Sequence, residues 1–140
     1  QAQALMLLVD SSVWIDVTRG LATDGTRFID ARDVDEELAT TGLIFQEVLQ
    51  GARDESAYVK ARDTFFAMLL LEPQGLATHE AAAQLYRRAR QAGFTIRKPT
   101  DCLIAALALE HDALLVHNDR DFLFLAQVEP ALLIFPGRPH

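Results

Sequence analysis

Five acidic side chains stand where the sequence predicts that strands end and helices begin. Asp10 follows a short apolar run at residues 5–9, Asp119 and Asp121 follow another at residues 113–117, and Glu47 and Asp101 lie near the starts of two apolar helices. Two carboxylates ~4 Å apart repel by about 4 kcal/mol at an effective dielectric near 20, unless a proton or cation intervenes. Oxygen ligands without Cys/His spacing favour Mg²⁺ or Mn²⁺ over zinc. Such an ion, held by carboxylates, suits the activation of water and the binding of phosphate.

Each acid also has an ordinary structural interpretation. An Asp between a strand and a helix is most often an N-cap, which applies to Asp10 and Asp101 taken singly. Glu47 is harder to explain in this way, because it lies just off the apolar arc that Ile44 and Val48 form on the predicted helix. A ligand in a cleft needs that position, whereas a surface glutamate gains nothing from it.

The elements that must position these acids alternate along the chain. Apolar or β-branched runs predict strands at residues 5–9, 37–43, 71–74, 113–117 and 131–135. Helical spacing predicts helices after Ser11, at 44–51, 55–70, 78–92 and 119–127, and from Pro99 to residue 110 or 111. This alternation predicts an α/β fold in three layers, with a parallel, flavodoxin-like sheet flanked by helices. The carboxyl ends of the strands and the amino ends of the helices then share one edge, where ligands bind.

The amino-acid composition limits the classes of protein and of function that fit this chain. The 140 residues are half hydrophobic and 24% charged, which fits one globular domain over residues 6–140. Residues 1–5 precede Met6 and are set apart as a remnant of expression or processing, or as a disordered segment. The net charge of −7 excludes a uniformly basic nucleic-acid binder. A single cysteine, Cys102, excludes a disulfide scaffold and fits the cytoplasm, and no apolar run is long enough to span a membrane.

Four segments resemble the motifs of PIN-domain ribonucleases, in the same order and on matching elements. They are residues 8–14 (LVDSSVW), 45–51 (FQEVLQG), 100–106 (TDCLIAA) and 117–122 (HNDRDF). Each motif alone is weak, but all four in order are a strong signal, and the resemblance spans essentially residues 6–135. The compact size is similar to that of VapC-type toxins from toxin–antitoxin pairs.

The resemblance implies hydrolysis of RNA that leaves a 5′-phosphate and a 3′-hydroxyl. By motif, Asp10, Glu47, Asp101 and Asp119 would be the catalytic acids that bind Mg²⁺ or Mn²⁺. Asp121 would assist at a second or weaker metal position, and the division of roles between Asp119 and Asp121 stays open. Ser12 and Asn118 match polar positions that orient ligands or water, or are simply cap and turn residues. The resemblance also implies a VapB-like antitoxin and a homodimer as partners.

A basic segment leads into the third motif. Between residues 81 and 100 there are five basic residues and no acid: Arg87, Arg88, Arg90, Arg97 and Lys98. We expect Arg87, Arg90, Arg97 and Lys98 to contact RNA phosphates, the alternative being a solvated helix face. Apolar groups within residues 55–70 and 122–125 exceed what one small core needs and suggest a partner or dimer surface.

Two other functions fit the pattern less well. A catalytically silent PIN module that binds protein or RNA would not need an acid at every motif. An aspartyl-phosphate phosphotransferase of the haloacid-dehalogenase type needs a second Asp two residues after the first, where this chain has Ser12. Neither a G-x-G-x-x-G nor a P-loop motif is present, which disfavours nucleotide binding.

Overall fold

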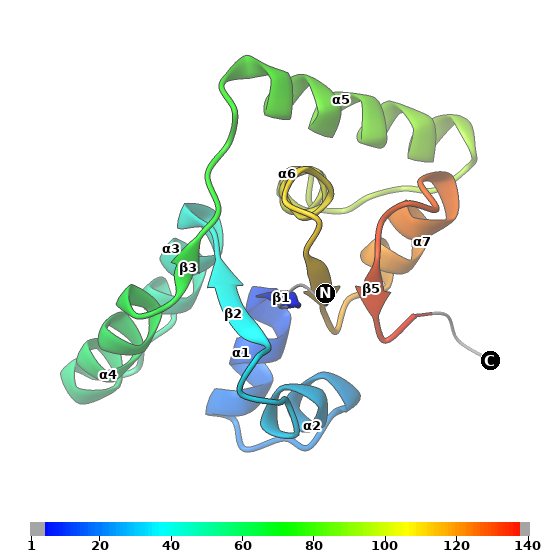
Figure 1. Ribbon diagram of the computed structural model, residues 1–140. Coiled ribbons are helices and arrows are strands. Elements are labelled where there is room, and N and C mark those ends of the chain that lie inside the picture. The colour runs from blue at the N-terminus through cyan, green and yellow to red at the C-terminus, as the bar shows by residue number, and fades with distance from the viewer. Residues whose placement is uncertain (1–4, 138–140) are drawn as a thin grey trace.

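Five parallel strands form one sheet in the computed structural model, which describes residues 5–137. In spatial order the strands are β3 (Leu69–Leu70), β2 (Glu37–Thr40), β1 (Met6–Val9), β4 (Leu114–Val116) and β5 (Ile134–Phe135). Every connection between successive strands carries helices (Figure 1). The helices in this part of the chain are α1 (Ser11–Thr18), α2 (Asp24–Asp30), α3 (Gly42–Gln50), α4 (Glu55–Phe66), α5 (Leu76–Gln91), α6 (Thr100–Glu110) and α7 (Arg120–Val128).

The strand order reverses direction between β1 and β4. The chain winds outward from β1 through β2 to β3, then returns to the other side of β1 to add β4 and β5. In the register of the central strands, Leu8 stands opposite Ala39 on β2 and Leu115 on β4. Loops that leave a parallel sheet on either side of such a reversal diverge and open a crevice at the carboxyl edge. The fold therefore predicts a ligand site where β1 and β4 end.

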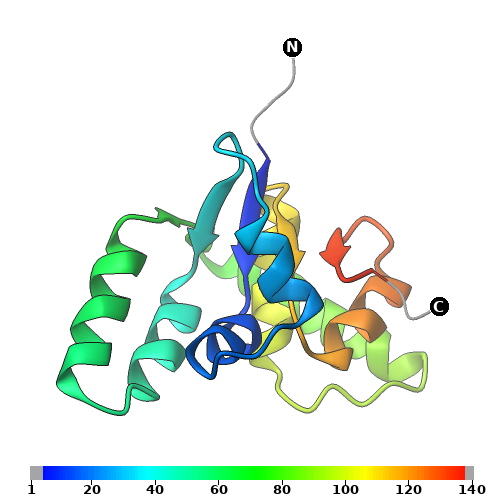
Figure 2. The same ribbon diagram turned by 90° about the horizontal axis from the view of Figure 1, so that it is seen from below.

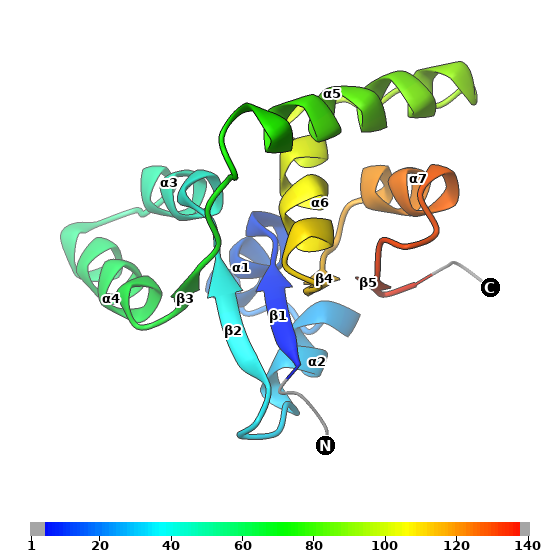
Figure 3. The ribbon, with the colours of Figure 1, turned by 45° about the horizontal axis from the view of Figure 1, so that its top comes forward.

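Alternate residues of the central strands face opposite layers, as the pleat requires. Leu7, Val9 and Val116 pack with residues of α1 and α2, whereas Leu8 and Leu115 pack beneath α5, α6 and α7. Figures 2 and 3 show these two helical layers on either side of the sheet, with α3 and α4 at the end of the sheet that carries β3. The predicted three-layer α/β fold is thus confirmed.

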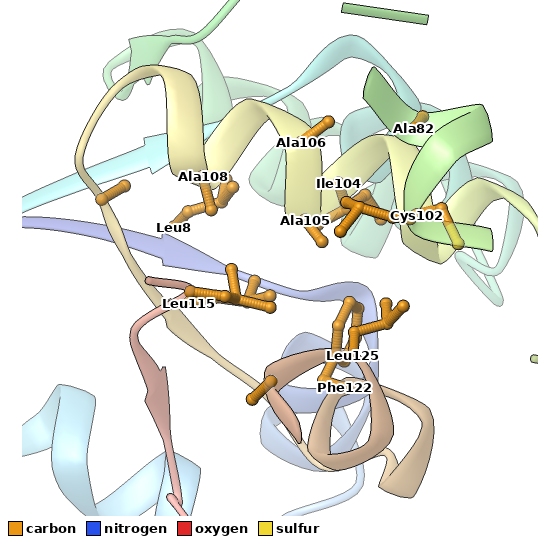
Figure 4. Close-up of a cluster of buried hydrophobic side chains, with 14 of the residues drawn as sticks. Leu8, Ala82, Cys102, Ile104, Ala105, Ala106, Ala108, Leu115, Phe122 and Leu125 are labelled. Atoms are coloured by element: carbon orange, nitrogen blue, oxygen red, sulfur yellow. The ribbon is translucent and has the colours of Figure 1, made fainter. Parts of the chain in front are cut away.

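Helix α6 lies in the middle of the larger core. Seven of its eleven residues are buried, and several of them are alanines, which let neighbouring helices approach closely. Figure 4 shows Ile104 and Ala105 of α6 above Leu125 and Phe122 of α7, with Leu8 of the sheet beneath Ala108 and Leu115 lower still. A helix held on all sides in this way fixes the direction of the side chains in its first turn, where Asp101 stands.

Several predicted boundaries are wrong. Strand β3 occupies residues 69–70 rather than 71–74, because α4 ends at Phe66 and not at residue 70. Strand β2 ends at Thr40, and Thr41 caps α3 through its side-chain oxygen, which accepts from the Ile44 N–H over 3.2 Å. Helix α3 therefore begins two residues before the predicted start at residue 44.

Helix α2 has no counterpart among the predicted elements. It is only seven residues long, and its signal is a local one in which Thr23 and Thr26 cap each other reciprocally. Its Gly25 packs against α1, where an added Cβ would lie 3.0 Å from a methyl carbon of Val13. The helix is therefore stabilised by packing rather than by a periodic apolar stripe.

On the basis of the sequence, residues 1–5 are set apart from the domain, and residues 1–4 of this segment lie outside the described residues. Within residues 5–137, no helix has the length and apolar character that crossing a membrane requires.

Candidate metal centre

Asp101 is positioned by the first turn of α6. Pro99 stands at the N-cap, where its fixed backbone angle suits a helix start, and Asp101 follows two residues later. Its side chain is buried at 2% exposure, and Oδ2 has no hydrogen-bond partner. Burial, and then the nearby charge of Asp10, raise the pKa of Asp101 to about 7, against an opposing effect of Lys98. A carboxyl group in this state is ready to exchange its proton for a cation.

Asp119 and Asp121 come from the loop after β4 and the start of α7. Asp119 is the N-cap of α7, and its Oδ1 accepts from the Asp121 N–H over 3.0 Å. Asp121 is buried at 1% exposure, and its Oδ1 has no hydrogen-bond partner. One carboxylate oxygen from each of Asp101, Asp119 and Asp121 lies within 4.8 Å of the others. The two sequence-predicted segments that carry these acids thus meet in one cluster.

Arg97 lies across this cluster. Its Nη2 donates to Asp119 Oδ1 over 3.0 Å, and its Nε lies 3.6 Å from Asp121 Oδ2. Its backbone N–H also donates to Asp121 Oδ2 over 3.0 Å. The charges of Asp119 and Asp121 raise the pKa of Arg97 accordingly. The sequence pattern predicted a role for Arg97 toward RNA phosphate, and its contacts with the two acids come from the structure alone.

Asp10 stands at the end of β1 and caps α1. Its Oδ2 accepts from the backbone N–H of Ser12 over 3.0 Å and from the Ser12 hydroxyl over 2.6 Å. Ser12 Oγ in turn accepts from the Asn118 N–H over 3.0 Å. The Asn118 side chain donates to Asp16 Oδ2 over 2.7 Å. These bonds tie the loop after β1 to the loop after β4, at the reversal of the strand order.

Glu47 approaches from the other side of α1. Its Oε1 accepts from the Ser11 hydroxyl over 3.3 Å, which ties it to the residue next to Asp10. It lies in the second turn of α3 and not in the first turn, because the helix starts at Gly42. Asp10 and Glu47 both stand outside the group of three acids that share the 4.8 Å limit. Asp10 is nevertheless near enough to raise the pKa of Asp101.

His117 supports the loop that carries Asp119. Its Nδ1 accepts from the Asp119 N–H over 3.1 Å, and its Nε2 pairs with the Pro136 carbonyl oxygen over 2.9 Å. Since a backbone N–H can only donate, Nδ1 must be unprotonated and Nε2 must carry the hydrogen. Burial lowers the pKa of His117 and favours this neutral form. His117 therefore fixes the position of this loop through both of its ring nitrogens.

Two polar residues of this network were outside the sequence prediction. Ser11 holds Glu47, and Asp16 holds the Asn118 side chain. The available signal was spacing, because Asp16 stands four residues after Ser12 and therefore on the same face of α1. Asp16 is buried and shares this helix face with Ser12. The spacing could therefore have identified Asp16 as a neighbour of the site.

The predicted basic residues fall into two groups. Arg87 and Arg90 are exposed on α5, whereas Arg97 and Lys98 are exposed in the segment that leads into α6. Arg88 instead donates to the Val128 carbonyl oxygen and pairs with Glu129 at 3.4 Å, which ties α5 to the end of α7. Only the second group adjoins the acids directly.

The donor set fits a hard divalent cation. Three carboxylates converge, two of them nearly inaccessible to water, and Asp101 Oδ2 and Asp121 Oδ1 are buried without a partner. Buried carboxylate oxygens are costly unless a hydrogen-bond donor or a cation satisfies them. Oxygen ligands of this kind suit Mg²⁺ and Mn²⁺. The residues that the structure groups for such an ion are Asp101, Asp119 and Asp121.

Comparison with known proteins identifies the family of the chain. The profile described as "PIN domain" matches residues 7–127. The VapC ribonuclease Mb1587 of Mycobacterium bovis is 36% identical over 127 residues, which cover 88% of this chain and 93% of that protein.

Two solved structures share the fold. One is VapBC-1 from nontypeable Haemophilus influenzae, with a TM-score of 0.70, 17% identity, and coverage of 93% of this chain and 96% of that one. The other is VapBC-5 of Mycobacterium tuberculosis, a member of the VapBC family of toxin-antitoxin systems, with a TM-score of 0.59, 21% identity, and coverage of 92% and 94%. The chain therefore belongs to the PIN domain family and, within it, to the VapC-type proteins.

Proposed function

We propose that this chain is a metal-dependent ribonuclease, the toxin of a toxin–antitoxin pair, that hydrolyses phosphodiester bonds of RNA. The observation that carries the proposal is the cluster of Asp101, Asp119 and Asp121, with two buried carboxylate oxygens that lack a partner. The relative in Mycobacterium bovis bears the name of a VapC ribonuclease and aligns over most of both chains. Residues 6–140 act as one PIN-like domain in this proposal.

The site residues have distinct roles. Asp10, Glu47, Asp101 and Asp119 hold Mg²⁺ or Mn²⁺ and make up the catalytic acids. Asp121 serves a second or weaker metal position. Ser12 orients Asp10, to which it donates over 2.6 Å, and Asn118 links that serine to the loop of Asp119. Bound Mg²⁺ or Mn²⁺ supplies a water of lowered pKa and charge that neutralises the phosphate.

Asp101 is the residue best placed to accept a proton. Burial raises the pKa of Asp101 to about 7 in the metal-free chain, and a bound cation would lower it toward the carboxylate form that accepts a proton. The buried surroundings of Asp101 and Asp121 exclude bulk water from that side. The Asp10–Ser12–Asn118 chain of hydrogen bonds keeps the opposite wall fixed.

RNA binding requires positive charge in an acidic protein. The net charge of −7 includes the acids of the centre, whose charge a bound cation offsets. Arg97 and Lys98 stand beside the centre, and Arg87 and Arg90 extend the basic surface along α5. We assign these four side chains to the RNA backbone.

The decisive experiment measures cleavage by the purified chain, without any partner, on total RNA and on short single-stranded RNA. We expect cleavage with Mg²⁺ or Mn²⁺, loss with a chelator, recovery when metal is restored, and 5′-phosphate ends. Asp101→Asn should abolish cleavage, whereas Asp63→Asn, an exposed acid of α4, should not. Cleavage that persists in Asp101→Asn, or that needs no metal, would contradict the proposal.

Two protein partners follow from the same family membership. We propose a VapB-like antitoxin and a homodimer as partners, with the chain itself acting in the cytoplasm on cellular RNA. The apolar surface of α4 and β3 is the candidate contact face, since Phe66 is 72% exposed and Tyr58, Leu69 and Leu70 are exposed as well. The cluster at residues 122–125 belongs mainly to the core, because Phe122 and Leu125 are buried. Light scattering of the chain alone tests for the dimer, and co-purification with the product of an adjacent gene tests for the antitoxin.

The alternatives predict different results in the same assays. A catalytically silent PIN module would bind RNA or protein without metal-dependent cleavage. An aspartyl-phosphate enzyme would gain the mass of a phosphoryl group on incubation with a small phosphodonor. Ser12 contacts Asp10 directly where that mechanism needs a second acid, which disfavours it.

A further inference from the structure

Arg97 makes an ion pair inside the acidic cluster, which is an unusual place for an otherwise exposed side chain. Its side chain is 57% exposed, whereas that of Asp119 is 11% exposed and that of Asp121 is 1% exposed. The guanidinium therefore extends from the solvent-exposed surface to carboxylates that are largely buried. The bond from Nη2 to Asp119 Oδ1 is 3.0 Å long, the length of a charge-assisted hydrogen bond.

The contact uses an oxygen of Asp119, one of the three carboxylates that lie within 4.8 Å of one another. Asp119 Oδ1 accepts from both Arg97 Nη2 and the Asp121 N–H. One of these donors is backbone and stays in place, so the guanidinium is the group that can leave. Asp121 is different, because the Arg97 backbone N–H holds its Oδ2 whatever the side chain at position 97 is. Removing the guanidinium thus leaves Asp119 Oδ1 with the Asp121 N–H alone, while Asp121 Oδ2 keeps its bond to the Arg97 N–H.

We propose that Arg97 is a built-in competitor of the divalent cation, which occupies Asp119 when no ion is bound and must give way when one binds. Arg97 is in this sense a positioning residue, since it acts through Asp119. Its positive charge offsets the repulsion between the carboxylates of Asp119 and Asp121 and so keeps them close together. The affinity for metal is lower because the cation must first replace the bond between Arg97 and Asp119. This inference rests on the metal centre that the proposed function requires.

Lys98 provides the matched comparison. It is the next residue along the chain, carries the same charge, and acts on Asp101 electrostatically. Among residues 5–137, however, the ion pairs and side-chain hydrogen bonds of the cluster involve Arg97 and not Lys98. Substitution of Lys98 therefore measures the effect of removing one nearby charge. The excess effect of substituting Arg97 measures direct competition for Asp119.

The experiment titrates the full chain with Mn²⁺, in the absence of RNA and antitoxin, and follows free Mn²⁺ by electron paramagnetic resonance. We expect Arg97→Gln to bind Mn²⁺ about tenfold more tightly than the wild type, the scale of one charge-assisted hydrogen bond. Arg97→Lys, which keeps the charge, should stay within about threefold of the wild type, as should Lys98→Gln, since exposed charges are well screened. Arg97→Met serves as a second neutral variant should Arg97→Gln fold poorly, and far-ultraviolet circular dichroism checks the fold of each.

The outcomes separate this inference from the proposed function. Equal or weaker Mn²⁺ binding by Arg97→Gln, with clear binding by the wild type, overturns the role of Arg97 and leaves the metal centre intact. Equal tightening by Lys98→Gln and Arg97→Gln also overturns it, because charge alone would then explain both. If the wild type and Arg97→Gln both fail to bind Mn²⁺, the metal centre itself is wrong and the inference falls with it.

Discussion

The Ser12 hydroxyl donates to Asp10 Oδ2 over 2.6 Å, while the oxygen of that hydroxyl accepts from the Asn118 N–H over 3.0 Å. One hydroxyl group therefore connects the loop after β1 with the loop after β4. Replacing it by hydrogen leaves the Asn118 N–H without this acceptor and leaves Asp10 Oδ2 with the backbone N–H of Ser12 alone. Because Ser12 is only half-buried, we expect its substitution to alter the metal centre rather than the packing of the core.

We predict that Ser12→Ala lowers metal affinity or RNA cleavage by about 10- to 100-fold, the usual effect of removing a residue that orients a metal ligand. Cleavage measured as a function of Mg²⁺ concentration separates weaker metal binding from slower turnover. Ser56→Ala, at an exposed position in α4, is the matched control and should behave as the wild type. Wild-type activity in Ser12→Ala at low Mg²⁺ would show that Asp10 needs no such support.

The raised pKa of Asp101 predicts how stability without metal depends on pH. Its pKa is about 7 in the folded chain against 3.8 when unperturbed, so between these values the folded state binds the proton and the unfolded state does not. The contribution of Asp101 to the free energy of unfolding must then fall as pH rises from about 4 to about 7, by at most ~1.4 kcal/mol per pH unit. Urea unfolding in the presence of a chelator measures this slope.

The substitution Asp101→Asn supplies the control for that slope and a prediction of its own. An amide cannot ionise, so the contribution of Asp101 to the slope should vanish. Above pH 7 the variant should be more stable than the wild type without metal, because burial no longer opposes a charge. Added Mn²⁺ should stabilise the wild type and leave Asp101→Asn nearly unchanged. A variant less stable than the wild type at pH 8 would mean that the carboxylate has a partner.

The sequence predicted the architecture better than the contacts inside the site. The apolar runs that form β1 and β4 are local signals, and so is the proline at which α6 begins. The structure places these three elements at the positions that the sequence predicted. Periodicity also leads to a parallel sheet, and a parallel sheet brings strand ends to one edge. Asp101, Asp119 and Asp121 meet there, as the rule requires.

What the sequence could not supply depends on packing between distant segments. The contact of Arg97 with Asp119 joins residues 22 apart, and that of Asn118 with Asp16 joins residues 102 apart. No local pattern encodes such pairs. Helix α2 was not predicted for the same reason. Its Gly25 lies close to Val13 of α1, and the periodicity of the sequence does not reveal this contact.

Cys102 should be unreactive in the folded chain. It follows Asp101 in α6 and is buried, and burial together with the Asp101 charge raises the pKa of its thiol to about 12. The thiolate is the reactive form, and almost none is present at neutral pH. We predict that a thiol reagent modifies Cys102 only after unfolding, as intact mass spectrometry with and without urea would show. Stoichiometric labelling of the native chain would mean that the first turn of α6 opens readily.

The basic surface beside the metal centre gives the last prediction, for which RNA binding is measured without cleavage in the Asp101→Asn background. Lys98 is exposed next to the first turn of α6, so its ammonium group can contact a phosphate of RNA bound at the centre. Lys98→Glu should weaken binding of a single-stranded RNA and reduce the slope of log affinity against log salt by about 0.7 for each phosphate that the protein no longer neutralises. Lys60→Glu makes the same change in charge on an exposed position of α4, away from the acids, and should leave that slope unchanged. An equal decrease of affinity in both variants would indicate that net charge alone controls binding, whereas a decrease confined to Lys98→Glu places the RNA backbone beside α6.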